Sequence, residues 1–197
     1  MKLDRTFYLN ENVVQLAKTF IGKLLVTNFN GFITSGIITE TEAYSNINDK
    51  ACHANNHKKT NRNANMFLNG GHAYVYLCYG IHPLFNIVTN KENIPDAILI
   101  RAIKPYMGIE KMKERKNITN IEKKNIAEGP GNITKLLGIT CNHNGIDLLK
   151  EQIWVEDIGF EYDKSKLSIG PRIGVDYAGE DALLPYRFKI ENKEINL

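Results

Sequence analysis

The segments "IITETEAY" (residues 37–44) and "HAYVYLCYGIHPLFN" (residues 72–86) carry the strongest structural signal in the sequence. In the first, an apolar run ends in the carboxylate of Glu42 and the ring of Tyr44. In the second, tyrosines are concentrated in a strand-like run that Gly80 closes. An acid beside several aromatic faces suits an enzyme that grips a flat ring and moves protons near it.

The residues before these segments predict a helix and a hairpin. Residues 11–22 place apolar side chains at helical spacing, with asparagines at the start and a glycine at the end. Residues 24–27 and 32–41 are typical of strands, and the "NFNG" between them is a turn signal. We expect this hairpin to deliver Glu42 to the rim of a sheet.

The residues around the tyrosine segment predict a long loop and a further strand. Residues 45–71 are polar and weakly periodic, so this loop is expected to be functional or disordered, although Met66 and Phe67 favour its folding back onto the core. The run "DAILIRAI" (residues 96–103) predicts a buried strand that carries one cation, Arg101, and is ended by Pro105.

Composition and charge set wide limits. The 197 residues, 43% hydrophobic and 24% charged, are ordinary for one globular domain, which we expect to span residues 1–197. A net charge of +3 is compatible with nucleic acid as a partner without requiring it. Three cysteines without a CxxC pair disfavour disulfides and structural zinc. Without a secretory signal or a membrane-length apolar run, a cytoplasmic location is expected.

The residues alone leave two interpretations open. Arg101 needs an anionic partner if it is buried, and its pairing with Glu42 could be a structural ion pair or a device that keeps a water-activating carboxylate ionised. On an alternating strand Tyr74 and Tyr76 share a face and Tyr79 lies opposite. These rings could belong to the core, or to a ring-binding pocket and a surface that wedges into a base stack.

Other site chemistries find little support in the sequence. His53 and His57 have helical ligand spacing, but no HExxH pattern is present. The Gly129–Gly131 turn before a short helix could present backbone N–H groups to a phosphate. No Walker loop, GxGxxG or GxSxG motif occurs, so neither a metal nor a cofactor is expected.

A family resemblance follows from the order of the motifs. "ETEAY", His53, "TNRNANMF", "GHAYVYLCYGIHPLFN", "AILIRA", "GPGNITK" and "PRIGVDYAGED…PYRF" succeed one another along the chain. In this the sequence resembles the alkyladenine (3-methyladenine) DNA glycosylases over essentially its whole length. The resemblance implies a single compact α+β domain, with a curved, mostly antiparallel sheet and surrounding helices, similar also to the formyltransferase C-terminal-like fold.

The resemblance also implies an activity. The family flips alkylated or deaminated purines, of the 3-methyladenine, hypoxanthine and ethenoadenine class, out of duplex DNA. It then hydrolyses the N-glycosidic bond. By motif position Glu42 is similar to the base that activates the water, while Arg101 and the backbone carbonyl of Ile173 position it. No lysine matches a catalytic position, so an abasic site without strand cleavage is expected.

Further roles are implied for binding. Tyr44, His53 and Tyr76 are similar to the walls that sandwich the flipped base. Tyr79 matches the side chain that intercalates into the duplex. Asn86 matches the amide that screens out guanine.

The chain departs from the family pattern at Asn61, Asn132 and Tyr186. At the first two positions relatives commonly have proline and lysine, which leaves Arg62 and Lys135 to contact the DNA backbone. The expected partner is damaged duplex DNA, bound by a monomer away from any membrane. The alternative is a non-catalytic damaged-DNA binding module, which would need neither Glu42 nor Arg101.

Overall fold

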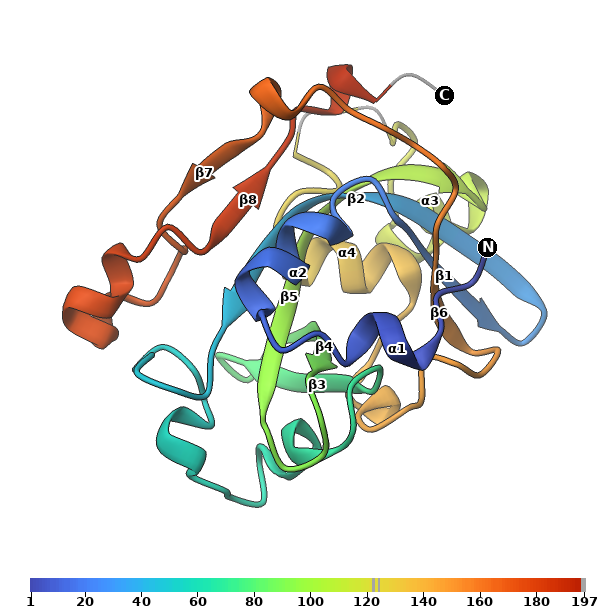
Figure 1. Ribbon diagram of the computed structural model, residues 1–197. Coiled ribbons are helices and arrows are strands. Elements are labelled where there is room, and N and C mark those ends of the chain that lie inside the picture. Colours follow the sequence, from blue (N-terminus) through green and yellow to red (C-terminus); the bar gives the residue numbers. More distant parts are fainter. Residues whose placement is uncertain (122, 124, 196–197) are drawn as a thin grey trace.

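A mostly antiparallel sheet organises the computed structural model, which describes residues 1–121, 123 and 125–195. Six strands follow the order β3-β4-β5-β2-β1-β6, and the short β7 pairs with β8, which in turn pairs with β2 (Figure 1). The strands are β1 (Leu24–Phe29), β2 (Phe32–Tyr44), β3 (Ala73–Cys78), β4 (His82–Thr89), β5 (Asp96–Met107), β6 (Ile153–Glu156), β7 (Ser168–Gly170) and β8 (Arg187–Lys189). The predicted α+β class is confirmed.

The helices are short. They are α1 (Arg5–Tyr8), α2 (Val13–Phe20), α3 (Ile109–Lys116) and α4 (Pro130–Leu137), with 3-10 turns at Asn55–His57, Ala64–Phe67, Cys141–His143, Lys164–Lys166, Asp176–Leu183 and Asn192–Glu194. The helix predicted at residues 11–22 is confirmed as α2, capped by Asn12, whose side chain accepts from the Gln15 amide. The Thr41 hydroxyl donates to the Ala17 carbonyl at 2.8 Å, which ties α2 to β2.

The core of the described residues includes one large cluster and a smaller one beside the tyrosine strand. The large cluster includes the fully buried Phe20, Phe85 and Phe188. The smaller one joins Met66 and Phe67 of the long loop to side chains of β3, β4 and β5, and its buried members are Cys52, Ala54, Met66, Phe67, Tyr74, Val88 and Ala97. The loop at residues 45–71 therefore folds back onto the sheet, as its two apolar residues indicated.

Two expectations about the strands are wrong. Pro105 does not end its strand, because β5 continues to Met107. The pairing tolerates the proline at a bulge, where Gly36 faces Pro105 and Ser35 faces Met107, so that Tyr106 is an extra residue. Glu42 is also not at the rim of the sheet, because it is paired with β5 on one side and with β8 on the other.

Two tight turns share the same backbone requirement. The "NFNG" hairpin is confirmed, and its Asn30 and Gly31 have φ values of 55° and 81°. Between β3 and β4, Tyr79 and Gly80 have φ values of 50° and 72°, and the Ile81 amide donates to the Cys78 carbonyl. Tyr79 therefore belongs to a turn and not to a strand face.

Among the described residues, no helix is long and apolar enough to cross a bilayer.

Candidate active site

A cavity of about 680 Å³ lies where the long loop and the C-terminal segment meet the tyrosine face of the sheet. This volume is within the range of ligand pockets. Four strands, the long loop, α4 and the C-terminal segment contribute the lining residues: Tyr44 from β2, Ala51, His53, Arg62 and Met66 from the loop, Tyr74, Tyr76 and Cys78 from β3, Tyr79 from the turn, His82, Leu84 and Asn86 from β4, Ala97, Leu99 and Arg101 from β5, Gly129–Asn132 at the start of α4, and Ile173–Val175 with Tyr177 near the C-terminus.

Strand register lays the candidate residues on one face. Residues paired across neighbouring strands project to the same side of a sheet, and so do residues two apart on one strand. One such row runs across five strands through Tyr74, Asn86, Leu99, Glu42 and Arg187. Tyr44 and Tyr76 lie two residues along their strands, so their rings project from the face that carries Glu42.

A β-bulge aims Arg101 at the carboxylates. Glu40 is paired with Ala102 and Thr41 with Ile100, so Arg101 is the extra residue between these pairs. Its Nε lies 3.1 Å from Glu40 Oε1 and 3.3 Å from Glu42 Oε1. Arg187 reaches the same Glu40 oxygen at 3.2 Å. Four side chains therefore alternate in charge, and Arg101 contacts both acids.

Two neutral donors also hold the Glu42 carboxylate. The Ile173 amide donates to Oε1 at 2.8 Å, and the Tyr44 hydroxyl donates to Oε2 at 2.7 Å. Glu42 is completely buried. Burial raises its pKa, against the opposing effects of Arg101, Tyr44 and the Ile173 amide. The contact that the structure shows with Ile173 runs through its N–H, whereas the sequence expectation concerned its carbonyl.

The three residues expected to hold the base, Tyr44, His53 and Tyr76, all line the cavity. His53 and Tyr76 have ring centroids 4.7 Å apart, and Tyr74 and Tyr76 have theirs 5.3 Å apart. His53 Nδ1 lies 2.9 Å from the hydroxyl of Tyr74, which is itself buried. Tyr44 packs against the same small cluster. The expectation that Tyr74 and Tyr76 share a face is confirmed.

Burial keeps two side chains of the cavity wall neutral. Burial, with a smaller contribution from the Arg62 charge, lowers the pKa of His53 to about 4. Burial and then the Glu42 charge raise the pKa of Tyr44 well above its ordinary value. His53 is therefore neutral at physiological pH, and Tyr44 keeps the proton that it donates to Glu42.

The remaining predicted residues occupy distinct places. Asn86 is buried, and its Nδ2 lies 3.1 Å from the Tyr74 carbonyl and 3.3 Å from the Leu84 carbonyl. Tyr79 is 88% exposed at the mouth of the cavity. Arg62 also lines the cavity, with its guanidinium 5.2 Å from the centre of the Tyr76 ring.

The start of α4 lines the cavity, but its one cation, Lys135, does not. Asn132 is engaged locally, since it donates to the Glu128 carbonyl and accepts from Lys116 at 2.5 Å. Lys135 is exposed on the outer side of α4. Of the two predicted backbone contacts, Arg62 is at the cavity and Lys135 is away from it.

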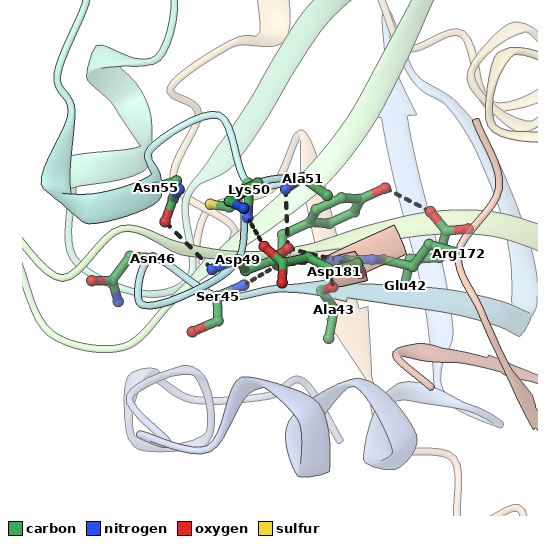
Figure 2. A network of polar contacts seen from close by, with 12 residues as sticks. Glu42, Ala43, Ser45, Asn46, Asp49, Lys50, Ala51, Asn55, Arg172 and Asp181 are labelled. Carbon is green, nitrogen blue, oxygen red and sulfur yellow. Dashed lines mark hydrogen bonds and ion pairs between the residues drawn. The ribbon is translucent and has the colours of Figure 1, made fainter. Parts of the chain in front are cut away.

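Arg172 is the site residue that sequence reasoning missed. It is buried, and it bonds both oxygens of Asp49 at 2.6 and 2.7 Å, the Ala43 carbonyl at 2.9 Å and the Asp181 carbonyl at 3.0 Å (Figure 2). An arginine between Pro171 and Ile173 gave no periodic signal, and its partner lies 123 residues away. The family motif "PRIGVDYAGED…PYRF" includes this segment but does not single out the arginine.

The zinc alternative finds no support in the part of the chain that the structure describes. His53 turns into the cavity, whereas His57 is exposed. In residues 1–121, 123 and 125–195, no group of three or more histidines, cysteines, aspartates or glutamates could hold a metal ion.

Comparison with known proteins assigns the chain to a family. Residues 6–194 match the methylpurine-DNA glycosylase (MPG) family. A Chlamydia felis protein is 45% identical over 192 residues, covering 98% of this chain and 97% of its own. Relatives from Bacillus cereus (39% over 198 residues, 97% of this chain and 96% of its own) and Clostridium perfringens (38% over 201 residues, 98% of both) are also similar. All three are named "Putative 3-methyladenine DNA glycosylase".

These matches define the class first: the protein is a DNA glycosylase, a hydrolase of N-glycosidic bonds in DNA repair. Within that class, the chain belongs to the methylpurine-DNA glycosylase family.

Proposed function

We propose that the protein flips alkylated or deaminated purines out of duplex DNA and hydrolyses their N-glycosidic bond with a water that Glu42 activates. The observation that carries the proposal is the buried Glu42 carboxylate, held by Arg101, Tyr44 and the Ile173 amide directly behind an aromatic cavity. Substrates of the 3-methyladenine, hypoxanthine and ethenoadenine class fit a cavity with flat walls.

The donors leave Glu42 capacity for a water. A carboxylate has about four acceptor positions, and the structure fills two of them with the Tyr44 hydroxyl and the Ile173 N–H, while Arg101 lies 3.3 Å away as an ion-pair partner. Because Arg101 and Ile173 line the cavity while Glu42 lies behind them, we place the water beside these two residues. The Ile173 carbonyl is proposed as its second acceptor. Glu42 then takes one proton from the water as its oxygen attacks C1′ of the sugar.

Binding energy comes from the walls. Extruding a nucleotide costs a few kcal/mol, and stacking on aromatic rings returns about 1–3 kcal/mol per base. In the proposal Tyr44, His53 and Tyr76 sandwich the base, and Tyr79 fills the gap that it leaves in the duplex. Asn86 rejects guanine at its exocyclic amino group. Arg62 and Lys135 are proposed to contact phosphates, Arg62 after it leaves the Tyr76 ring.

One carboxylate suffices where the departing base is a good leaving group. Glycoside hydrolases usually need a second carboxyl group as the general acid. A 3-methyladenine or 7-methylguanine is already cationic and leaves without strong acid assistance. The product is then a free base and an abasic site in an unbroken strand.

Release of free base from duplex oligonucleotides tests the proposal. The wild-type protein should release 3-methyladenine or hypoxanthine, and the strand should break only after alkali treatment. Glu42→Gln should still bind a duplex with an abasic analogue but lose release by a factor of about 10² or more, as expected for a missing general base. Glu11→Gln, which removes an exposed ion pair with Lys91, is the matched control and should retain release. Full excision by Glu42→Gln would refute the assignment.

A further inference from the structure

One ion pair, between Arg172 and Asp49, joins two segments that are far apart in sequence and that both lie near the Glu42 carboxylate. Arg172 and Asp49 are buried partners, with side chains 0% and 1% exposed. Both nitrogens of the Arg172 fork engage Asp49, which is the strongest geometry for an arginine and a carboxylate. Figure 2 shows this pair at the centre of a network that also reaches Asp181.

The pair fixes the end of β2. Arg172 donates to the Ala43 carbonyl, and its guanidinium lies 4.8 Å from the centre of the Tyr44 ring. The guanidinium also lies 5.3 Å from the centre of the Tyr186 ring. A planar cation that contacts two rings restrains both of them. The Tyr44 hydroxyl that bonds Glu42 is therefore set by Arg172.

Asp49 fixes the start of the loop. Its Oδ2 accepts from the Ser45 amide at 3.1 Å, and its Oδ1 accepts from the Ala51 amide at 3.1 Å. Each oxygen therefore serves one loop amide and one nitrogen of Arg172. The loop beyond Ala51 carries His53, which also lines the cavity.

The segment after Arg172 carries the second donor. Ile173 is the next residue, and its N–H bonds Glu42 Oε1 at 2.8 Å. An amide in an irregular segment keeps its direction only if the neighbouring residue is anchored. Arg172 is that anchor, since its side chain makes four hydrogen bonds to Asp49 and to two carbonyls.

We propose that the ion pair between Arg172 and Asp49 is a positioning device for the Glu42 carboxylate. It holds both neutral donors of that carboxylate, Tyr44 and the Ile173 amide, in place. Neither partner touches the base or the water in this role. The inference rests on the proposed function of Glu42 as the general base.

Arg172→Lys tests the inference, because lysine keeps the charge but loses the fork and the flat face. Donors to a carboxylate favour its ionised form, so a loosened Tyr44 or Ile173 should raise the pKa of Glu42. We expect the acidic limb of the pH profile for single-turnover release to move up by about one pH unit, with about tenfold slower release on that limb. Affinity for a duplex with an abasic analogue should change less than about twofold, since no DNA contact is removed.

The chain offers a control in a second arginine–aspartate pair. Nη2 of Arg5 contacts both oxygens of Asp147 at 2.8 Å, and neither residue lines the cavity. Arg5→Lys should lower the melting temperature as a structural substitution does, yet leave the pH profile unchanged. Asp49→Glu, which keeps the charge but displaces the carboxylate from the Arg172 fork, repeats the test if the Arg172 variant does not fold.

A spectroscopic titration separates this inference from the proposed function. The carboxyl carbon of Glu42 in ¹³C-glutamate-labelled protein, assigned with Glu42→Gln, reports its pKa without any turnover. An upward shift in Arg172→Lys, absent in Arg5→Lys, is expected. An unchanged titration would reduce the pair to a structural role and overturn the inference, even if the wild type excises bases. A wild type that releases no base would overturn the proposed function, while the titration would still decide the role of Arg172.

Discussion

Replacing Tyr79 by asparagine should stabilise the fold while it weakens base release. Tyr79 and Gly80 are the central residues of a tight turn, with φ values of 50° and 72°. A β-turn in which both central residues have positive φ favours Asn-Gly at those positions. The same chain uses that pair at Asn30 and Gly31, with φ values of 55° and 81°. A bulky residue at the first position therefore indicates a requirement other than folding.

The magnitudes follow from the geometry. A non-glycine residue in the left-handed region raises the free energy of the fold by about 1 kcal/mol, and the increase is smaller for asparagine. Because Tyr79 is 88% exposed, its removal forfeits little burial. We expect a gain of about 0.5–1 kcal/mol in the free energy of unfolding, or about 1–4 °C in melting temperature for a chain of this size. Loss of one stacked ring, worth about 1–3 kcal/mol, should slow release by about 5- to 150-fold.

Calorimetry and single-turnover release on a hypoxanthine duplex measure the two effects. Tyr79→Phe keeps the ring and should keep both properties near wild type. Asn30→Tyr is the reciprocal control, since it installs the unfavourable residue in the other turn, and it should destabilise the fold without slowing release. Undiminished release by Tyr79→Asn would refute the intercalation role. Destabilisation by more than about 1 kcal/mol would refute the argument from the turn.

Three further outcomes are expected. Since burial raises the pKa of Glu42, the folded protein holds this proton more tightly than the unfolded chain, and its stability falls as pH rises through the folded pKa. Glu42→Gln should therefore have a higher melting temperature than wild type at neutral pH. A difference in melting temperature that does not depend on pH would contradict this. With a pKa near 4, His53 should show no NMR titration between pH 5 and 8. The buried thiol of Cys52, with a pKa of about 12, should resist alkylation while the exposed Cys141 reacts, and equal rates would show that the loop opens.

Several secondary-structure elements and strand faces could be predicted, because they depend on patterns among residues that are close together in sequence. The α2 helix follows from apolar spacing and its caps, and the β1–β2 hairpin follows from "NFNG". The shared face of Tyr74 and Tyr76 follows from strand alternation. Glu42 and Arg101 were paired by the cost of burying a lone cation, and the structure shows this ion pair.

What could not be predicted depends on contacts between distant segments. The bulge that places Arg101 between Glu40 and Glu42 arises from a register shift between β2 and β5, which no pattern on either strand records. Arg172 and Asp49 each lie outside helices and strands, so the spacing of apolar residues gives no information about either of them. Pro105 was misjudged because its tolerance depends on the same pair of strands being bulged.

The arrangement around Glu42 reconciles two opposed demands on a buried base. Burial alone would protonate the carboxyl group, and a protonated Glu42 cannot accept a proton from water. A cation paired with Glu42 alone would keep the carboxylate ionised, but it would lower the pKa so far that the carboxylate became too weak a base. Arg101 avoids this because Glu40 shares its charge, and Arg187 in turn pairs with Glu40. The remaining stabilisation comes from neutral donors, Tyr44 and the Ile173 amide, which hold the carboxylate without adding charge. It follows that Glu40→Gln, by leaving Arg101 to Glu42 alone, should lower the pKa of Glu42 and move the acidic limb to lower pH, opposite in sign to Arg172→Lys.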